Sequence, residues 1–172
     1  MTRFAMPALG LAVLLAIPAH AQAPARAFVG TTIGESAVTA TSSSAEAMDR
    51  AQQFARVGNY RKAARAYRAA AEQQLRAGEL PEMALWQEAN MYFAMKDNAR
   101  AAASLDRLAG LAADYGNPVA EARAMLHAAL LHAQAGNADR AMTLASDLRT
   151  LRNSPFIGDD LRAEIDQRLD RP

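Results

Sequence analysis

The sequence predicts an all-α fold, and its composition and its turn residues carry that prediction. Alanine fills 43 of the 172 positions, and alanine is the best helix former and is depleted in β-strands. Nine glycines, seven prolines and no cysteine exclude the collagen-like, low-complexity and disulfide-rich classes. The length fits a single domain. We therefore expect packed helices joined by short turns.

Residues 1–21 have the pattern of a secretory signal peptide. Arg3 supplies a positive charge, the stretch from Phe4 to Ile17 is uncharged and mostly apolar, and Ala19-His20-Ala21 offers small residues to a signal peptidase. This apolar run is short for a membrane span of about 20 residues. We predict cleavage after Ala21, a periplasmic or secreted location and no stable membrane anchor. Cleavage after Ala23 and a retained anchor are the alternatives.

The charge of the mature chain is predicted to be balanced. The chain has 19 basic and 18 acidic residues, and Arg3 leaves with the signal peptide, so 18 of each remain. A net charge of zero gives no general attraction to nucleic acid, and we expect no nucleic-acid partner. One local basic run comprises Arg56, Arg61, Lys62, Arg65 and Arg68. It fits a solvated helix face better than a site for an acidic partner or anionic lipid.

Residues 22–43 are predicted to form a flexible linker, because Ser, Thr, Gly and Ala dominate without a helical period. Phe28, Val29 and Ile33 are exceptions that would suit docking or a short strand. Residues 44–172 are predicted to form the helical domain.

Regular turn signals divide this domain. Gly58-Asn59-Tyr60, Asp97-Asn98-Ala99 and Gly136-Asn137-Ala138 are spaced 39 residues apart, twice over. Glycine ends a helix in the left-handed conformation, and the following asparagine can cap the next helix. Spacing of this kind indicates a repeat architecture.

A second series of signals interleaves with the first. Pro81, Pro118 and Pro155 are 37 residues apart, and proline suits the first turn of a helix. The two series predict three helical hairpins and a C-terminal capping helix. The expected helices are 45–57, 60–77, 81–96, 98–115, 118–135, 137–152 and 158–170.

Two helices show informative faces. In the third, one predicted face comprises Trp86, Ala89, Asn90 and Phe93. Met91 and Met95 lie on the opposite face, so this helix is expected to lie between neighbours. In the last, the apolar stripe is Leu161, Ile165 and Leu169. The other face is charged and includes a Glu164–Arg168 pair, as an end helix of a stacked array requires.

The residues around the turns resemble the tetratricopeptide repeat (TPR) family over about residues 44 to 152. The first unit matches with Phe54, Gly58-Asn59-Tyr60, Ala63, Tyr67 and Ala70. The second supplies Trp86, Phe93, Asp97-Asn98, Ala102 and Ala109, with Asp106 at an aromatic site. The third supplies Met125, Ala129, Gly136-Asn137, Ala141 and Leu148, with His132 at an aromatic site. The period exceeds the usual 34 residues, and other α-hairpin solenoids stay open as alternatives.

The resemblance implies a TPR-like α-hairpin solenoid whose first helices line a concave groove. By register, the groove residues are Met48, Gln52, Arg56, Gln87, Met91, Met95, Arg123, Leu126, Leu130 and Gln134. Methionines are adaptable contact residues and glutamines can bond a peptide backbone, so we expect a peptide or protein partner. Packing between hairpins is the alternative for Met91, Leu126 and Leu130.

The sequence contains no recognisable catalytic constellation. Metalloprotease, nucleophile-elbow and phosphate-loop motifs are missing, and His127 and His132 lie on different helix faces. Asp159-Asp160 fits a helix start. We expect a non-enzymatic interaction or scaffold module without metal or cofactor. The alternatives are a structural or self-associating envelope protein that forms homo-oligomers, and a non-catalytic accessory to a cell-envelope enzyme.

Overall fold

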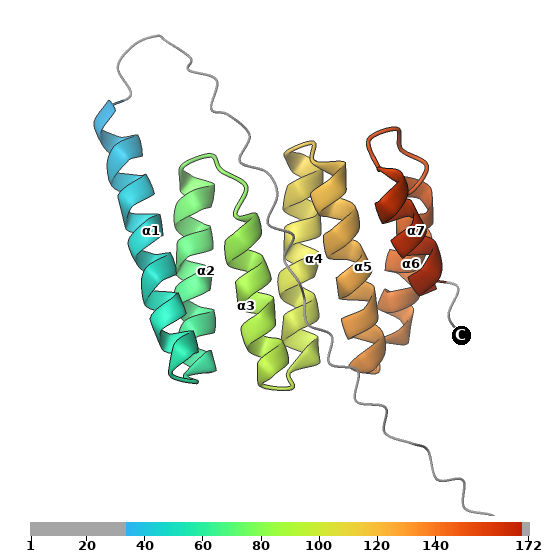
Figure 1. The fold of residues 1–172 in the computed structure, drawn as a ribbon, viewed down its shortest axis with the longest axis horizontal. Helices are drawn as coiled ribbons and strands as arrows, with labels where there is room; N and C mark the ends of the chain where they lie inside the picture. The colour runs from blue at the N-terminus through green and yellow to red at the C-terminus, as the bar shows by residue number, and fades with distance from the viewer. Residues whose placement is uncertain (1–33, 170–172) are drawn as a thin grey trace, which may run out of the picture. The chain divides into compact units, whose positions relative to one another are not determined.

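The computed structural model describes residues 34–169, with side chains from Ser44 onward, and this part contains seven helices and no strand (Figure 1). The helices are α1 (Gly34–Arg56), α2 (Tyr60–Arg76), α3 (Glu82–Ala94), α4 (Asn98–Asp114), α5 (Pro118–Gln134), α6 (Ala138–Leu151) and α7 (Asp159–Leu169). The all-α prediction is confirmed, and the bounds of α2 to α7 agree with the predicted ones to within two residues. The predicted signal peptide and residues 22–33 lie outside the described residues.

The first helix corrects the predicted linker. Helix α1 begins at Gly34, so residues 34–43 are helical. This stretch contains no proline, and adding residues to an existing helix avoids the unfavourable nucleation step. Composition alone therefore placed the start of the helical domain too late.

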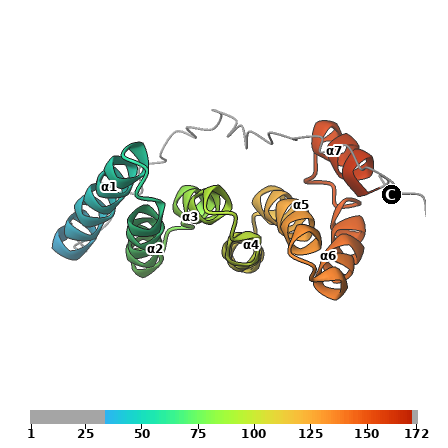
Figure 2. The same cartoon turned by 90° about the horizontal axis from the view of Figure 1, so that it is seen from below.

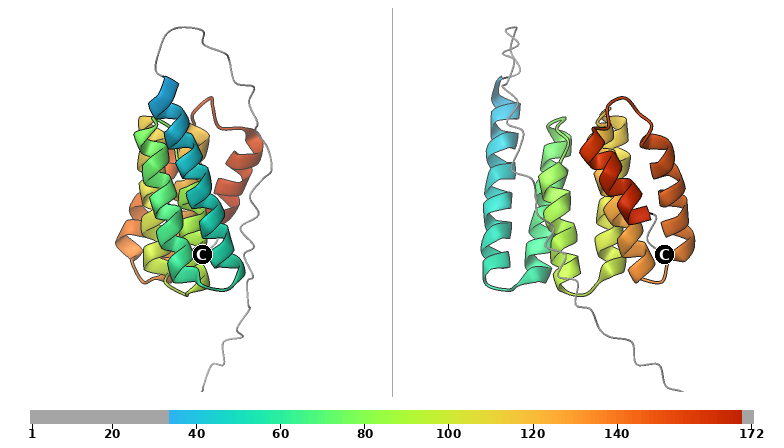
Figure 3. Two further views of the ribbon diagram at one scale, coloured as in Figure 1. Left: turned by 90° about the vertical axis from the view of Figure 1, so that its left-hand side faces the viewer. Right: turned by 45° about the vertical axis from the view of Figure 1, so that its right-hand side comes forward.

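Consecutive helices lie side by side and antiparallel in chain order (Figure 1), and each contacts the next. Seen along the helices, α1, α3, α5 and α7 form one layer and α2, α4 and α6 the other (Figure 2). Two rotated views show the helices following one another in the same order (Figure 3). We call the two sides of this row the odd face and the even face.

Local turn chemistry sets the helix ends as predicted. Gly58, Gly116 and Gly136 have φ of 73°, 64° and 81°, in the left-handed region that glycine adopts without strain. The side chains of Asn59 and Asn117 accept hydrogen bonds from Lys62 N at 3.3 Å and Ala120 N at 3.1 Å. These caps satisfy backbone donors that the first helical turn leaves free.

The middle turn is shifted by one residue from the prediction. Lys96, with φ of 60°, occupies the left-handed position, and Asp97 caps α4 through a 3.1 Å bond from Arg100 N. Asp97 therefore corresponds to Asn59, and the predicted alignment with Gly58 is wrong.

The end of the array also departs from the predicted turn pattern. Pro155 does not start a helix, because α7 begins at Asp159, and Asn137 makes no side-chain cap bond. The stripe of α7 is confirmed: Leu161 and Ile165 are buried and Leu169 packs against them. Glu164 and Arg168 form the expected ion pair at 3.4 Å.

Alanine forms much of the core. Ala63, Ala101 and Ala102 have no exposed surface, and they lie early in α2 and α4, where these helices contact their neighbours. A methyl group at these sites lets two helix axes approach closely, and a larger side chain would separate them. Ala141, the third predicted member of this set, is only half-buried. Among residues 34–169, no helix is both long and apolar enough to cross a membrane.

Candidate functional site

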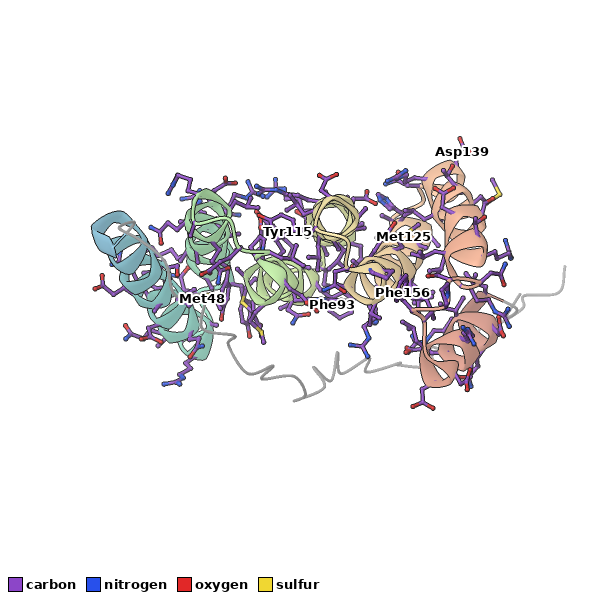
Figure 4. The ribbon with its side chains drawn as sticks, turned by 90° about the horizontal axis from the view of Figure 1, so that it is seen from above. Met48, Phe93, Tyr115, Met125, Asp139 and Phe156 are labelled. Carbon is purple, nitrogen blue, oxygen red and sulfur yellow. The ribbon has the colours of Figure 1, made fainter. Side chains whose placement is uncertain are left out.

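The odd face carries most of the predicted groove residues. Gln87, Met91 and Met95 follow i, i+4, i+8 spacing along α3 and its end, and all three are partly exposed. Met48 on α1 is also partly exposed and, like Met91, packs against Ala51, Ala63 and Tyr67. Figure 4 shows Met48 and Phe93 toward this face and Asp139 on the other. Gln52 and Arg56 continue the α1 stripe and are exposed.

Helix α5 contributes less to this surface than predicted. Leu126 is 1% exposed and belongs to the core, so it is not a surface contact. Arg123 and Leu130 are half-buried. Gln134 is exposed, and its Oε1 accepts a 3.2 Å hydrogen bond from Asn98 Nδ2 at the start of α4. The packing alternative for Leu126 is therefore correct, because α5 has neighbours on several sides and buries more of its circumference than an edge helix.

An aromatic contact links α3 to α5. The rings of Trp86 and His127 meet edge to face, with centroids 5.1 Å apart and planes at 84°. Burial lowers the pKa of His127 below its ordinary value of 6.5, and Arg168 acts in the same direction. His127 is thus held as a neutral ring and serves packing, not charge.

The most buried face of α3 differs from the predicted one. Leu85, Glu88 and Tyr92 are buried. Of the predicted face, Ala89 is buried, whereas Trp86 and Phe93 are only partly covered. The hydrophobic pattern missed this face because its central member is a carboxylate.

Glu88 is 1% exposed and is paired with Arg68 of α2. Arg68 Nε donates to Glu88 Oε1 at 2.8 Å, and its Nη2 lies 3.4 Å from the Tyr92 hydroxyl. Burial raises the pKa of Glu88 above its ordinary 4.5, although the hydrogen bond from Arg68 acts in the opposite direction. Such a pair mainly fixes which residues face each other, because desolvation offsets most of the attraction.

Ion pairs also join the helices of the even face. Arg107 of α4 meets Glu72 of α2 at 2.7 Å, and Asp106 of α4 meets Arg140 of α6 at 3.1 Å. The other oxygen of Asp106 lies 2.8 Å from His132 Nε2. Neighbouring residues of α4 therefore hold the helices on either side of it.

A shallow depression of about 300 Å³ opens on this face between α2, α3 and α4. Its cations already have carboxylate partners: Arg68 pairs with Glu88, Arg107 with Glu72, and Arg100 with Asp97. An incoming anion would have to displace one of these carboxylates. We therefore assign the network a structural role.

A second hollow, of about 430 Å³, lies at the turn between α1 and α2, beside the end of α3. Val57, Tyr60, Arg61 and Met95 are among its lining residues. Val57 is 76% exposed and Tyr60 is 37% exposed, so the hollow presents apolar surface to solvent. The sequence pattern had placed Tyr60 only as a repeat residue and gave no signal for a concavity.

Arg61 lines this hollow, and more positive charge lies close to it in the sequence. Arg56, Arg61, Lys62 and Arg65 are all exposed, and none of them forms an ion pair within the described part of the chain. The first turn of α2 carries two of these cations and no acid, although the helix dipole favours acids there. The start of α2 therefore carries cations where acids would be more stable, and it does so next to an exposed apolar surface. This combination points to a binding role.

Over residues 34–169, no group of three or more His, Asp or Glu side chains could hold a metal ion. Comparison with protein-family models, curated proteins and solved structures found no match to this chain. The functional argument therefore rests on the surfaces described above.

Proposed function

We propose that this chain is an exported, TPR-like helical scaffold that binds a peptide or partner protein on its odd face. The observation that carries the proposal is the pair of stripes on α1 and α3. Each stripe repeats every four residues and combines methionine with polar side chains: Met48, Gln52 and Arg56 on α1, and Gln87, Met91 and Met95 on α3.

The direction of the helices supports an extended ligand. Helices α1 and α3 flank the antiparallel α2, so they run in the same general direction (Figure 1). The stripe of each helix follows that direction. Partly exposed methionines can adapt to different apolar side chains, while Gln52 and Gln87 can bond a backbone. The even face is a poorer candidate, because ion pairs occupy the cations that line its depression.

The TPR resemblance points to the same side, since the first helices of TPR hairpins line the groove. The antiparallel succession of helices in chain order is compatible with such an array. Export, the solenoid assignment and the identity of the partner are parts of the proposal.

Capture of partners from the envelope fraction of the source organism tests the proposal. The double variant Met91→Glu/Met95→Glu should lose a partner that the unchanged protein retains. Ala103→Glu/Met142→Glu adds the same charges at exposed positions of α4 and α6 and should keep it. Gln52→Ala/Gln87→Ala repeats the test without charging half-buried sites. Recovery of the same partners in equal yield from all variants would reject the odd face.

A further inference from the structure

The loop between α6 and α7 presents an aromatic side chain to solvent. Phe156 is 73% exposed, while the next residue, Ile157, is 1% exposed (Phe156 is labelled in Figure 4). Arg162 holds the loop by donating from Nη2 to Ser154 O at 3.1 Å and from Nε to Arg152 O at 3.3 Å. The loop is thus anchored on both sides of a phenylalanine that stays outside the core.

Acidic residues follow this phenylalanine closely. Asp159 and Asp160 open α7, and both are exposed. Asp159 pairs with Arg162 at 3.0 Å, whereas Asp160 forms no ion pair among the described residues. The loop therefore places an exposed aromatic side chain next to one carboxylate, Asp160, that no ion pair neutralises among the described residues.

The hollow at the α1–α2 turn has the complementary character. Val57, Tyr60 and Met95 supply an apolar lining, and Arg61 stands at its edge. Lys62 and Arg65 follow Arg61 in α2 and add positive charge, with no carboxylate partner in the part of the chain that the structure describes. This open hollow is lined by apolar and polar residues together, and its volume of about 430 Å³ has room for one aromatic side chain.

The two features cannot meet within one molecule, because the α1–α2 turn and the α6–α7 loop lie at opposite ends of the row (Figure 1). We propose that the protein associates head to tail, with Phe156 of one copy seated in the hollow of the next. Asp160 then faces Arg61 across the contact. Because the two contacting surfaces differ, the contact is heterologous and each copy keeps one free site of each kind.

The strength of the contact follows from its size. One aromatic anchor with a charged rim buries less surface than a standard stable interface, so association in roughly the micromolar range or weaker is expected. The protein is purified in the form that the cell produces and is studied by sedimentation. Its average mass should rise with concentration between about 1 µM and about 1 mM. Higher salt should weaken the association.

Three variants test which surfaces are involved. Phe156→Ser should weaken association by at least about tenfold, since aromatic anchors dominate small contacts. Val57→Glu/Tyr60→Glu alters the hollow and should weaken association by a similar factor. Met142→Ser, at another exposed apolar position, should leave association unchanged. Circular dichroism verifies that each variant keeps its helices.

Mixing provides the decisive experiment. Phe156→Ser retains the hollow and Val57→Glu/Tyr60→Glu retains the phenylalanine, so the two variants together should form one-to-one dimers and no larger species. An unchanged chain that is monomeric at every concentration overturns the proposal and leaves the hollow to a segment of another protein. Association that survives Phe156→Ser unchanged, or a mixture that stays monomeric, also overturns it.

Discussion

Asp106 of α4 and His132 of α5 are joined by a 2.8 Å hydrogen bond between Oδ2 and Nε2, and Oδ1 of the same carboxylate lies 3.1 Å from Arg140 Nη2 of α6. Three consecutive helices therefore meet at one side chain. His132 is 8% exposed, so its end of the bond lies mostly away from solvent.

A double-mutant cycle on Asp106 and His132 measures this connection. Asp106→Ala should lower the free energy of unfolding by about 1–3 kcal/mol, because it leaves Nε2 of a buried imidazole without its partner. Coupling with His132→Ala should be about 0.5–3 kcal/mol in urea unfolding. The Asp97–Arg100 pair, in which the arginine side chain is 64% exposed, is the control and should couple by less than about 1 kcal/mol. Equal coupling in both cycles would contradict the assignment.

Replacement of Lys96 by glycine should stabilise the protein. Lys96 has φ of 60°, a conformation that is unfavourable for residues with a Cβ. Lys96→Gly should raise the free energy of unfolding by about 0.5–1 kcal/mol after the entropy of the added glycine is counted. Gly136→Ala should lower the free energy of unfolding. The cause is backbone conformation alone, since an added Cβ meets no atom within 4 Å. Chemical denaturation of both variants checks the pair; a Lys96→Gly protein of lower stability would refute the argument.

Ala102 tests the close approach of helices in the core. It has no exposed surface, so Ala102→Phe should destabilise the protein by about 1–3 kcal/mol through overpacking. Ala103→Phe, one residue along on the exposed side of α4, should change stability by no more than about 0.5 kcal/mol. Thermal melts compare the two. Similar melting temperatures would mean that α4 is rotated from the orientation described.

Glu88 gives the stability a defined pH dependence. Its folded-state pKa lies above the ordinary 4.5, so between these two values the folded protein binds more protons than the unfolded chain. Stability contributed by this site is therefore present at low pH and is lost as pH rises through the interval above 4.5. Glu88→Gln removes the titration and keeps an oxygen that can accept from Arg68.

Urea unfolding from about pH 4 to about pH 8 measures this effect. The stability of Glu88→Gln relative to the unchanged protein should rise through the interval above 4.5 and then level off. Glu79→Gln removes an exposed carboxylate and serves as the control. Parallel pH curves for Glu88→Gln and the unchanged protein would show that the buried carboxylate is not the cause.

Most of the helix bounds could be predicted because the signals that set them are local. Gly58, Asn59, Gly116 and Asn117 act on the backbone within a few residues, so their positions are sufficient to place helix ends. Lys96 was missed because a non-glycine residue in the left-handed conformation carries no sequence signal.

The packing partners could not be predicted to the same extent. Periodicity ranks residues by hydrophobicity, and it therefore could not identify Glu88 as a core residue, since its burial depends on Arg68 from another helix. Asp106 and His132 both depart from the TPR pattern, and only the structure shows that they pair with each other.

At the candidate site, too, local features could be predicted from the sequence and contacts between helices could not. Spacing placed Met91 and Met95 on one partly exposed stripe of α3, but the hollow beside Met95 depends on how α3 meets the α1–α2 turn. Leu126 was misplaced because burial of α5 is decided by several neighbouring helices.

Site-specific photo-crosslinking in cells of the source organism tests the proposed odd-face binding surface most directly. A photoreactive residue replaces Gln87 on α3 in one strain and Ala103 on α4 in another. Binding on the odd face predicts a discrete crosslinked product with a second protein from position 87 and none from position 103. Crosslinking from position 103 alone, or the same product in equal yield from both positions, would contradict it.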